Sequence, residues 1–321
     1  MTLAPRFAAN DRSWVRLSAG QVAARERVLA KLASGEYAQA SSPCFCGLPP
    51  HDIHVADRDR YGLPVRTVLC GNCGLMRSDP RLDAPSAARF YRDDYRDLYT
   101  GPGNGETLFE SQRQRGEGLL RLLAKLVPQI DSVYEVGCGA GGLLAPFAAV
   151  GKRVAGVDLG DEYLGIGRAH GLTLVHGDAS ALLAHQGRPA DLVLLMHVLE
   201  HYHDLRASVA EVATLVADGG VLLVEVPGLA TIATHYRNDV LLYLQNAHNY
   251  HFTAATLQFV LRGCGLDVRA CTDDGVALCV KPEAGQRVAP MPAPAGEAER
   301  VMRLLAELET RFAAAAGPRA A

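Results

Sequence analysis

A glycine-rich turn between an apolar segment and a helix-like segment is the feature that most restricts what this chain can fold into. Residues 132–136 read SVYEV, and residues 137–142 read GCGAGG. Glycines at such a junction permit a tight turn from strand to helix and let a ligand approach the backbone closely. Glu135 precedes the first glycine. Its carboxylate repels a pyrophosphate and attracts a cation, so the turn differs from the dinucleotide fingerprint G-x-G-x-x-G.

Strand-like apolar runs alternate with helical segments from this turn onward. The strand-like runs are 132–137, 152–159, 172–178, 191–198 and 221–227, followed by 266–273 and 276–282. Helical segments at 142–150, 161–170, 204–217 and 253–265 separate them, with a shorter helix after residue 178. Such alternation predicts an α/β fold in which helices cover both faces of a mostly parallel sheet.

The E-x-G-x-G-x-G spacing resembles the first motif of class I S-adenosylmethionine-dependent methyltransferases, and the resemblance covers about residues 110–282. It implies a Rossmann-like, doubly wound, seven-stranded, mostly parallel sheet. It also implies S-adenosylmethionine as cofactor and S-adenosylhomocysteine as product. The cofactor-binding residues that it implies are Glu135, Gly137, Cys138, Gly139, Gly141, Asp158, Leu159, Asp178, Ala179 and His197.

Two acids at the ends of successive predicted strands have individual roles in this resemblance. It implies that Asp158 accepts hydrogen bonds from both ribose hydroxyls, since one carboxylate can accept several. It implies that Asp178 binds the adenine amino group and that the N–H of Ala179 faces the adenine ring. Taken singly, each acid also suits a helix cap or a turn residue.

The segment after the fourth predicted strand carries the candidates for proton transfer. It reads HVLEH at 197–201, and in related methyltransferases its first histidine lines the cofactor pocket. Methyl transfer to oxygen requires a base for the acceptor's proton, and histidine is suited to that task near neutral pH. We expect His201 or His248 to be the base and Glu200 to orient or polarise one of them. A divalent metal on His197, His201 and His203 is an alternative.

Four of the eight cysteines form two close pairs, Cys44 with Cys46 and Cys70 with Cys73. Two such pairs separated by a loop predict a closed tetrahedral zinc site, which is structural because it has no open position. His51 and His54 are alternative ligands. The remaining cysteines have apolar neighbours and are expected to be buried.

A cysteine module ahead of a class I domain resembles sugar C-methyltransferases of deoxysugar pathways and related methyltransferases of polysaccharide gene sets. Those C-methyltransferases carry a glutamate–histidine pair. The histidine corresponds to His248 here, but Ala247 stands in the glutamate position. This difference favours a sugar hydroxyl as the acceptor over carbon, with C-methylation as an alternative. The remaining substrate-binding candidates are Tyr91, Tyr95, Tyr236, Tyr243, Asn246 and His251.

The sequence predicts five segments. They are a helical segment at 1–40, a zinc-binding module at 41–82, a helical linker or acceptor wall at 83–128, a methyltransferase domain at 129–282 with a lid-like insertion at 229–252, and a Pro/Ala linker with an amphipathic helix at 283–321. The apolar stripe of that last helix suits docking on its own chain or a homodimer contact.

Charge and hydropathy argue against several partner classes. The net charge is −3, whereas proteins that coat nucleic acid are usually far more basic. The apolar runs are much shorter than the roughly 20 residues of a membrane span. No signal-peptide pattern opens the sequence, so we expect a cytoplasmic enzyme with a small-molecule acceptor. The alternatives are an RNA or protein methyltransferase and a non-catalytic cofactor-binding scaffold.

Overall fold

The computed structural model describes residues 3–10, 12–99, 105–127 and 129–316. The chain forms two compact units. The first, here called the sheet unit, comprises Asn104–Val226 and Leu257–Met291. The second, the cysteine unit, comprises Met1–Gly103, Pro227–Thr256 and Pro292–Ala321. Both units are therefore built from segments that are far apart in the sequence. No helix in the described ranges has the length and apolar character needed to cross a membrane.

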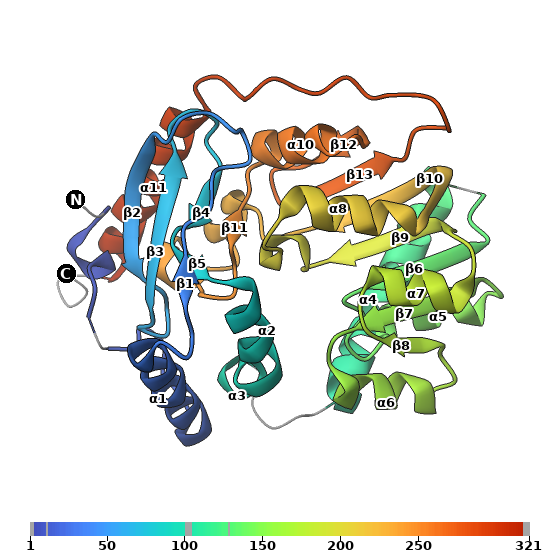
Figure 1. Ribbon diagram of the computed structural model, residues 1–321, viewed down its shortest axis with the longest axis horizontal. Helices are drawn as coiled ribbons and strands as arrows, with labels where there is room; N and C mark the ends of the chain where they lie inside the picture. The colour runs from blue at the N-terminus through green and yellow to red at the C-terminus, as the bar shows by residue number, and fades with distance from the viewer. Residues whose placement is uncertain (1–2, 11, 100–104, 128, 317–321) are drawn as a thin grey trace. The chain divides into compact units, whose positions relative to one another are not determined.

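The sheet unit is organised around seven strands in the order β12-β13-β10-β9-β6-β7-β8 (Figure 1). They are β6 (Ser132–Val136), β7 (Arg153–Asp158), β8 (Leu174–His176), β9 (Ala190–Met196), β10 (Val216–Glu225), β12 (Asp267–Cys271) and β13 (Val276–Val280). The neighbours from β10 to β8 pair in parallel, and β13 is antiparallel to both β10 and β12. The predicted seven-stranded, mostly parallel sheet is confirmed.

Helices cover this sheet because the strands are apolar on both faces. They are α4 (Gly105–Leu126), α5 (Ala145–Ala149), α6 (Asp161–Ala169), α7 (Ala179–Gln186), α8 (Leu205–Thr214) and α10 (Ala254–Gly263), whose residues from Leu257 onward belong to this unit, with short 3-10 turns η2 (Gly142–Leu144) and η3 (Leu199–His201). Helix α4 packs against α5 and α6, and α7 packs against α8. Phe109 of α4 and Phe147 of α5 share a buried core with Val133 and Leu194 of the strands.

The cysteine unit contains an antiparallel sheet that the sequence did not predict, with strand order β11-β4-β3-β2. Its strands are β2 (Asp52–Arg58), β3 (Pro64–Cys70), β4 (Met76–Ser78) and β11 (Tyr250–His251), and a separate pair is formed by β1 (Gln39–Ala40) and β5 (Arg81–Leu82). Its helices are η1 (Pro5–Phe7), α1 (Ala19–Ser34), α2 (Ala84–Asp93), α3 (Tyr95–Tyr99), η4 (Leu229–Ile232), α9 (Val240–Tyr243) and α11 (Glu297–Ala316). Among the described residues of the predicted helical segment 1–40, only 19–34 form an α-helix.

The structure groups the five predicted segments differently from their order in the chain. The helix at 105–126 belongs to the sheet unit, whereas the predicted lid-like insertion at 229–252 belongs to the cysteine unit. The physical reason is a shared core, because Leu241 of α9 is buried with Leu69 of β3 and Val301 of α11. The predicted boundary at residue 128 lies outside the described residues.

The C-terminal helix α11 docks on its own chain. Its apolar stripe, represented by Val301, Leu305 and Leu308, is buried in the core of the cysteine unit. Of the two roles considered for this stripe, docking is therefore the one observed, and the stripe no longer supports a homodimer contact. Figure 1 shows the segment before α11 as a long strap without helix or strand.

Candidate cofactor and acceptor sites

The glycine turn after β6 adopts a backbone that side chains would disturb. Gly137, Gly139 and Gly141 have φ angles of +72°, +55° and +75°, which lie in the left-handed region where residues with a Cβ are strained. A Cβ at Gly137 would also lie 2.4 Å from Cγ2 of Val198. The turn therefore needs glycine for both its conformation and its close packing.

Gln112 of α4 fixes this turn from the helix side. Its Nε2 donates to the carbonyl of Cys138 at 3.1 Å, and its Oε1 accepts from the N–H of Gly142 at 3.2 Å. The amide nitrogen and the amide oxygen of Gln112 thus each make one hydrogen bond to the turn. Sequence reasoning missed this residue, because a glutamine on an amphipathic helix carries no signal until the helix is placed.

Glu135 at the end of β6 is a buried carboxylate with an unused oxygen. The residue is 1% exposed, and its Oε2 has no hydrogen-bond partner among the described residues. Burial raises its pKa well above the ordinary value, and the charge of Asp158 adds to the rise. A buried carboxylate is costly unless a donor or a cation satisfies it. The residues present therefore fit a cationic ligand beside the glycine turn, as the methyltransferase resemblance requires.

Asp158 at the end of β7 is oriented by two backbone donors. Its Oδ2 accepts from the N–H of Gly139 at 2.8 Å, and its Oδ1 accepts from the N–H of Gly160 at 2.7 Å. Each carboxylate oxygen retains a second lone pair, so the group still has capacity for two further donors. Leu159 beside it is 70% exposed, which leaves an apolar surface next to an acid at the sheet edge.

Asp178 is the N-cap of α7. Its Oδ1 accepts from the N–H of Ala181 at 3.0 Å and from the hydroxyl of Ser180 at 2.7 Å. These bonds, with the one to Ser180 as the larger contribution, lower the pKa of Asp178. Ala179 is the buried first residue of the helix. The capping role considered for this acid is therefore present, and its proposed contact with adenine would use the other oxygen.

His197 occupies a strained position between two carboxylates at the end of β9. Its φ is +57°, which is unusual for a residue other than glycine and marks a local constraint. Its Nε2 lies 3.3 Å from Glu225 and its Nδ1 lies 3.7 Å from Glu200. Loss of surrounding water opposes the charged ring, but these carboxylates outweigh it and raise the pKa of His197 to about 9.

Glu225 and Arg115 complete this charged group, and the sequence did not single out either. Glu225 ends β10, and Arg115 of α4 pairs with it. Because the imidazolium of His197 is stabilised by carboxylates, it is a poor proton acceptor at neutral pH. His197 is therefore poorly suited to act as the base, in contrast to the candidates His201 and His248.

Glu200 and His201 lie in the 3-10 turn η3 that follows β9. Glu200 is 1% exposed, and its Oε1 is 3.8 Å from Nε2 of His201. The predicted proximity of this acid to a histidine is present. His197, His201 and His203 do not converge on a common ion position in the described ranges, so the alternative of a metal on these three histidines has no geometric support.

The four paired cysteines of the cysteine unit converge. Their Sγ atoms all lie within 4.8 Å of one another. The Sγ atoms of Cys44 and Cys73 are 3.5 Å apart, and those of Cys46 and Cys70 are 3.8 Å apart. A tetrahedral ion with metal–sulfur bonds of roughly 2.3 Å places its sulfurs about 3.8 Å apart. The cluster therefore has the dimensions of a tetrahedral thiolate site.

The two histidines considered as alternative ligands are absent from this cluster in the described part of the chain. His54 contacts Asp57 at 2.7 Å instead. The backbone carbonyl of His51 accepts from the N–H of Gly71 at 2.6 Å, so His51 supports the turn between Cys70 and Cys73. Interaction with Cys70 raises the pKa of the Cys44 thiol to about 12.

Three tyrosines form a row on α2 and α3. The ring centroids of Tyr91 and Tyr95 are 5.0 Å apart, and those of Tyr95 and Tyr99 are 4.7 Å apart in a stacked arrangement. The substrate-binding candidates Tyr91 and Tyr95 therefore lie in one aromatic row, and its rings are half-buried. Tyr99 contacts the side chain of Asn246, which joins the row to the segment that carries His248.

The remaining residues that were predicted to bind the methyl acceptor differ in exposure. Tyr243 is 1% exposed and donates its hydroxyl to the carbonyl of Pro227 at 2.7 Å, so it serves the core. Tyr236 packs edge-on against it. His251 lies 5.2 Å from Tyr243 between ring centroids. Burial lowers the pKa of His251 to about 3, which keeps its ring neutral, and its Nδ1 has no partner among the described residues.

The comparisons with known proteins bear on the sheet unit. The profile of a family described as a methyltransferase domain matches residues 109–270, half of the chain. The chain belongs to this methyltransferase family. The matched residues contain the glycine turn, Asp158, Asp178 and the HVLEH segment.

Curated relatives of this methyltransferase match over the same region. A ubiquinone biosynthesis O-methyltransferase of Aromatoleum aromaticum is 36% identical over 94 residues, covering 27% of this chain and 40% of the relative. One of the same name from a Caulobacter species is 32% identical over 146 residues, covering 44% of this chain and 50% of the relative. The chain thus spans half or less of the length of these relatives.

Among solved structures, S-adenosylmethionine-bound CalS10 is described as an amino pentose methyltransferase from Micromonospora echinaspora. It is 26% identical and covers 36% of this chain and 50% of its own, with a TM-score of 0.32.

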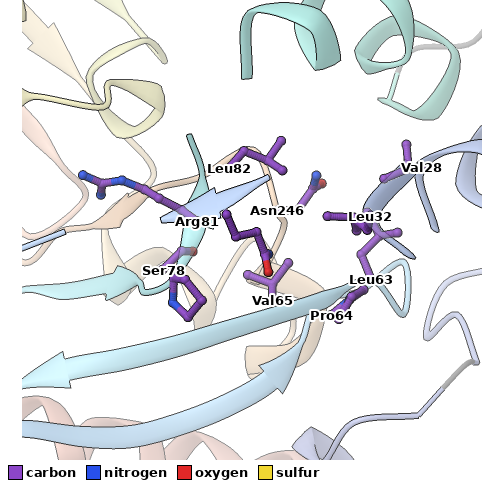
Figure 2. A pocket seen from close by; sticks show the side chains of 11 residues that line it. Val28, Leu32, Leu63, Pro64, Val65, Ser78, Arg81, Leu82 and Asn246 are labelled. Atoms are coloured by element: carbon purple, nitrogen blue, oxygen red, sulfur yellow. The ribbon is translucent and has the colours of Figure 1, made fainter. Parts of the chain in front are cut away.

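One pocket of this methyltransferase lies within the cysteine unit between α1 and the sheet, and Figure 2 shows its lining. Its lining combines apolar side chains such as Leu63 and Leu82 with the polar side chains of Arg81 and Asn246. Its volume is about 20 Å³, which is room for about one water molecule. It is therefore too small for a methyl acceptor, although Asn246 lines it as well as contacting the tyrosine row.

Proposed function

We propose that this protein is an S-adenosylmethionine-dependent methyltransferase that acts on an oxygen atom of a small molecule. The observation that carries the proposal is Glu135, a buried carboxylate whose Oε2 lacks a partner beside a glycine turn. When bound, S-adenosylmethionine supplies a methyl group activated by a positively charged sulfur. Asp158 would receive the ribose hydroxyls, and Glu135 would offset positive charge on the cofactor.

The remaining task of the chain is to align the acceptor and take up its proton. Transfer to oxygen is an in-line displacement, so alignment contributes much of the rate. His201 and His248 are the two candidates for the single base, and Glu200 lies 3.8 Å from the first of them. Loss of a general base typically lowers turnover about 10²–10⁴-fold.

The proposed acceptor is a sugar hydroxyl. The support is the cysteine module ahead of the sheet unit, the half-buried tyrosine row and the amide of Asn246, groups suited to binding hydroxyls. Ala247 in place of a glutamate disfavours C-methylation. The curated relatives are named O-methyltransferases of ubiquinone biosynthesis, so a phenolic hydroxyl is the second candidate.

We further propose that the four cysteines bind one structural zinc ion. The support is the convergence of four sulfurs within 4.8 Å and the closed thiolate set, which leaves no position for a substrate. Metal analysis of the purified protein should give about one zinc per chain. Replacing Cys70 and Cys73 by Ser should remove it, and zinc retained by that variant would exclude this site.

Calorimetry with S-adenosylmethionine tests the cofactor site. The wild type should bind, and Asp158→Ala should weaken binding by about tenfold or more for the loss of two hydrogen bonds. Glu135→Gln keeps the shape but cannot ionise beside a bound cation, so it should weaken binding of the sulfonium cofactor more than binding of its product S-adenosylhomocysteine, which lacks the sulfonium charge. Asp274→Ala, on an exposed turn, is the control. No binding by the wild type would overturn the proposed function.

The acceptor is tested by methyl transfer from labelled cofactor to a panel of nucleotide sugars, glycans and catechols. Product from a sugar with the label on oxygen supports the first candidate, and product from catechols alone supports the second. Label transferred to RNA or protein only would replace the small-molecule proposal. Binding without transfer to any class would favour a cofactor-binding scaffold.

A further inference from the structure

The segment around His248 is held rigidly within the cysteine unit. The Oδ2 of Asp59 accepts from the N–H of Asn246 at 2.9 Å. The hydroxyl of Ser78 donates to the carbonyl of His248 at 3.1 Å. Asp59 and Ser78 are themselves buried. The backbone at Asn246 and at His248 is therefore fixed by Asp59, which directly follows β2, and by Ser78 at the end of β4.

Arg60 determines which way the amide of Gln245 points. Its Nη2 lies 2.5 Å from Oε1 of Gln245. A guanidinium group only donates hydrogen bonds, so the atom that faces it must be the amide oxygen. The reverse orientation would place the amide NH₂ against a cation. The contact with Arg60 therefore identifies which side-chain atom of Gln245 is the oxygen and which is the nitrogen.

The amide nitrogen of Gln245 in turn contacts Nε2 of His248. An amide NH₂ carries only donors, so Nε2 of His248 must accept. A neutral imidazole with an accepting Nε2 carries its proton on Nδ1. A doubly protonated ring would instead place an N–H against the NH₂ of Gln245. The charged form of His248 is therefore disfavoured by this contact.

We propose that Arg60 and Gln245 are positioning residues that hold His248 as the neutral tautomer with its proton on Nδ1. In this state Nε2 is occupied and Nδ1 already bears a proton. His248 is then a hydrogen-bond donor and not the base of the reaction. His201 is then the group that takes up the acceptor's proton. This inference rests on the proposed function.

The tautomer can be measured without any assay of activity. Two-bond proton–nitrogen correlation of the ¹⁵N-labelled full chain separates protonated from unprotonated ring nitrogens, and His248→Asn identifies the signals of His248. The expected result near neutral pH is a protonated Nδ1 and an unprotonated Nε2. A proton on Nε2, or on both nitrogens, overturns the inference.

Substitutions at Gln245 test the cause of the tautomer. Gln245→Glu replaces the donor by a carboxylate that accepts from both Arg60 and His248, so the proton of His248 should move to Nε2. Gln245→Met has similar length without hydrogen-bonding groups, so it should impose no such reversal. An unchanged tautomer in Gln245→Glu, with the fold intact by circular dichroism, would contradict the role of this residue.

Kinetics separate the two histidines once an acceptor is known. His201→Ala should lower kcat about 10²–10⁴-fold and remove the acid limb of its pH profile. His248→Asn retains a donor, so it should keep that limb and lose about tenfold or less in kcat. The opposite pattern overturns the inference. Absence of cofactor binding in the wild type would overturn the proposed function instead, while the measured tautomer would stand.

Discussion

The two units of this chain show how differently a fold can be encoded. In the sheet unit, neighbouring segments of the sequence pair in space, and the candidate cofactor residues lie at the ends of successive strands. In the cysteine unit, three distant stretches share one core. Strand β4 pairs with β11, about 170 residues further along the chain. Local periodicity therefore describes the first unit well, whereas the second depends on long-range contacts and a candidate metal.

The largest expected effect comes from removing the metal site. Structural zinc contributes roughly 10–16 kcal/mol to the folding of small zinc-finger peptides. Replacing Cys70 and Cys73 by Ser should therefore unfold much of the cysteine unit. The sheet unit has its own buried core, so binding of S-adenosylmethionine by calorimetry should survive. Loss of cofactor binding together with the zinc would contradict the expectation that the sheet unit stays folded when the cysteine unit unfolds.

The next effect concerns the ion pairs that join the three stretches of the cysteine unit. Arg6 pairs with Asp239 at 2.7 Å and with Glu309 at 2.5 Å, and its side chain is 9% exposed. Arg6→Met should lower the free energy of unfolding by about 3–5 kcal/mol because the buried Asp239 and the half-buried Glu309 both lose their partner.

Urea unfolding measures that loss for Arg6→Met, with Arg311→Met as the matched control. Arg311 pairs with Glu307, and both side chains are more than 60% exposed. Such a surface pair is worth about 0–1 kcal/mol. Equal effects of the two substitutions would show that the network around Arg6 does not hold the stretches together.

A pH effect is expected from Asp59. Burial raises the pKa of this carboxyl from its ordinary 3.8 to about 6, against the lowering effect of three backbone hydrogen bonds and Arg60. The folded state therefore holds this proton more tightly than the unfolded state. The corresponding stability is fully present below pH 3.8 and is lost as pH rises through about 6, by up to about 3 kcal/mol.

Comparison with Asp59→Asn isolates this effect, because the variant lacks the titrating group and keeps the others. Urea unfolding at pH 4 to 7 should show the wild type losing stability relative to the variant as pH rises. A pH-independent difference between the two proteins would contradict the raised pKa.

The smallest effect tests the glycine turn of the sheet unit. Gly137→Ala should destabilise by about 1–3 kcal/mol, because φ is +72° and the new Cβ would lie 2.4 Å from Val198. It should also weaken cofactor binding in calorimetry. Gly165→Ala is the control, since this glycine lies within α6 with open space around it. That change should stabilise by about 0.5–1 kcal/mol. Equal effects at both positions would contradict a strained turn.

Much of the sheet unit could be predicted from the sequence. Alternating apolar runs indicated its seven strands, and the letters E-x-G-x-G-x-G placed the turn that Gly137 and its neighbours form. Spacing alone also indicated that four cysteines would converge. These features are formed by residues close together in the sequence or by uncommon residue types, so they can be recognised from the sequence.

Only the tertiary structure decided the rest. It placed Gln112 on the glycine turn and Arg60 against Gln245, and neither residue belongs to a motif. It also buried the stripe of α11 in its own unit, where sequence left docking and dimerisation equally open. Hydrogen bonds and packing between distant segments depend on how the chain folds back on itself, and a periodicity of two or 3.6 residues carries no record of that.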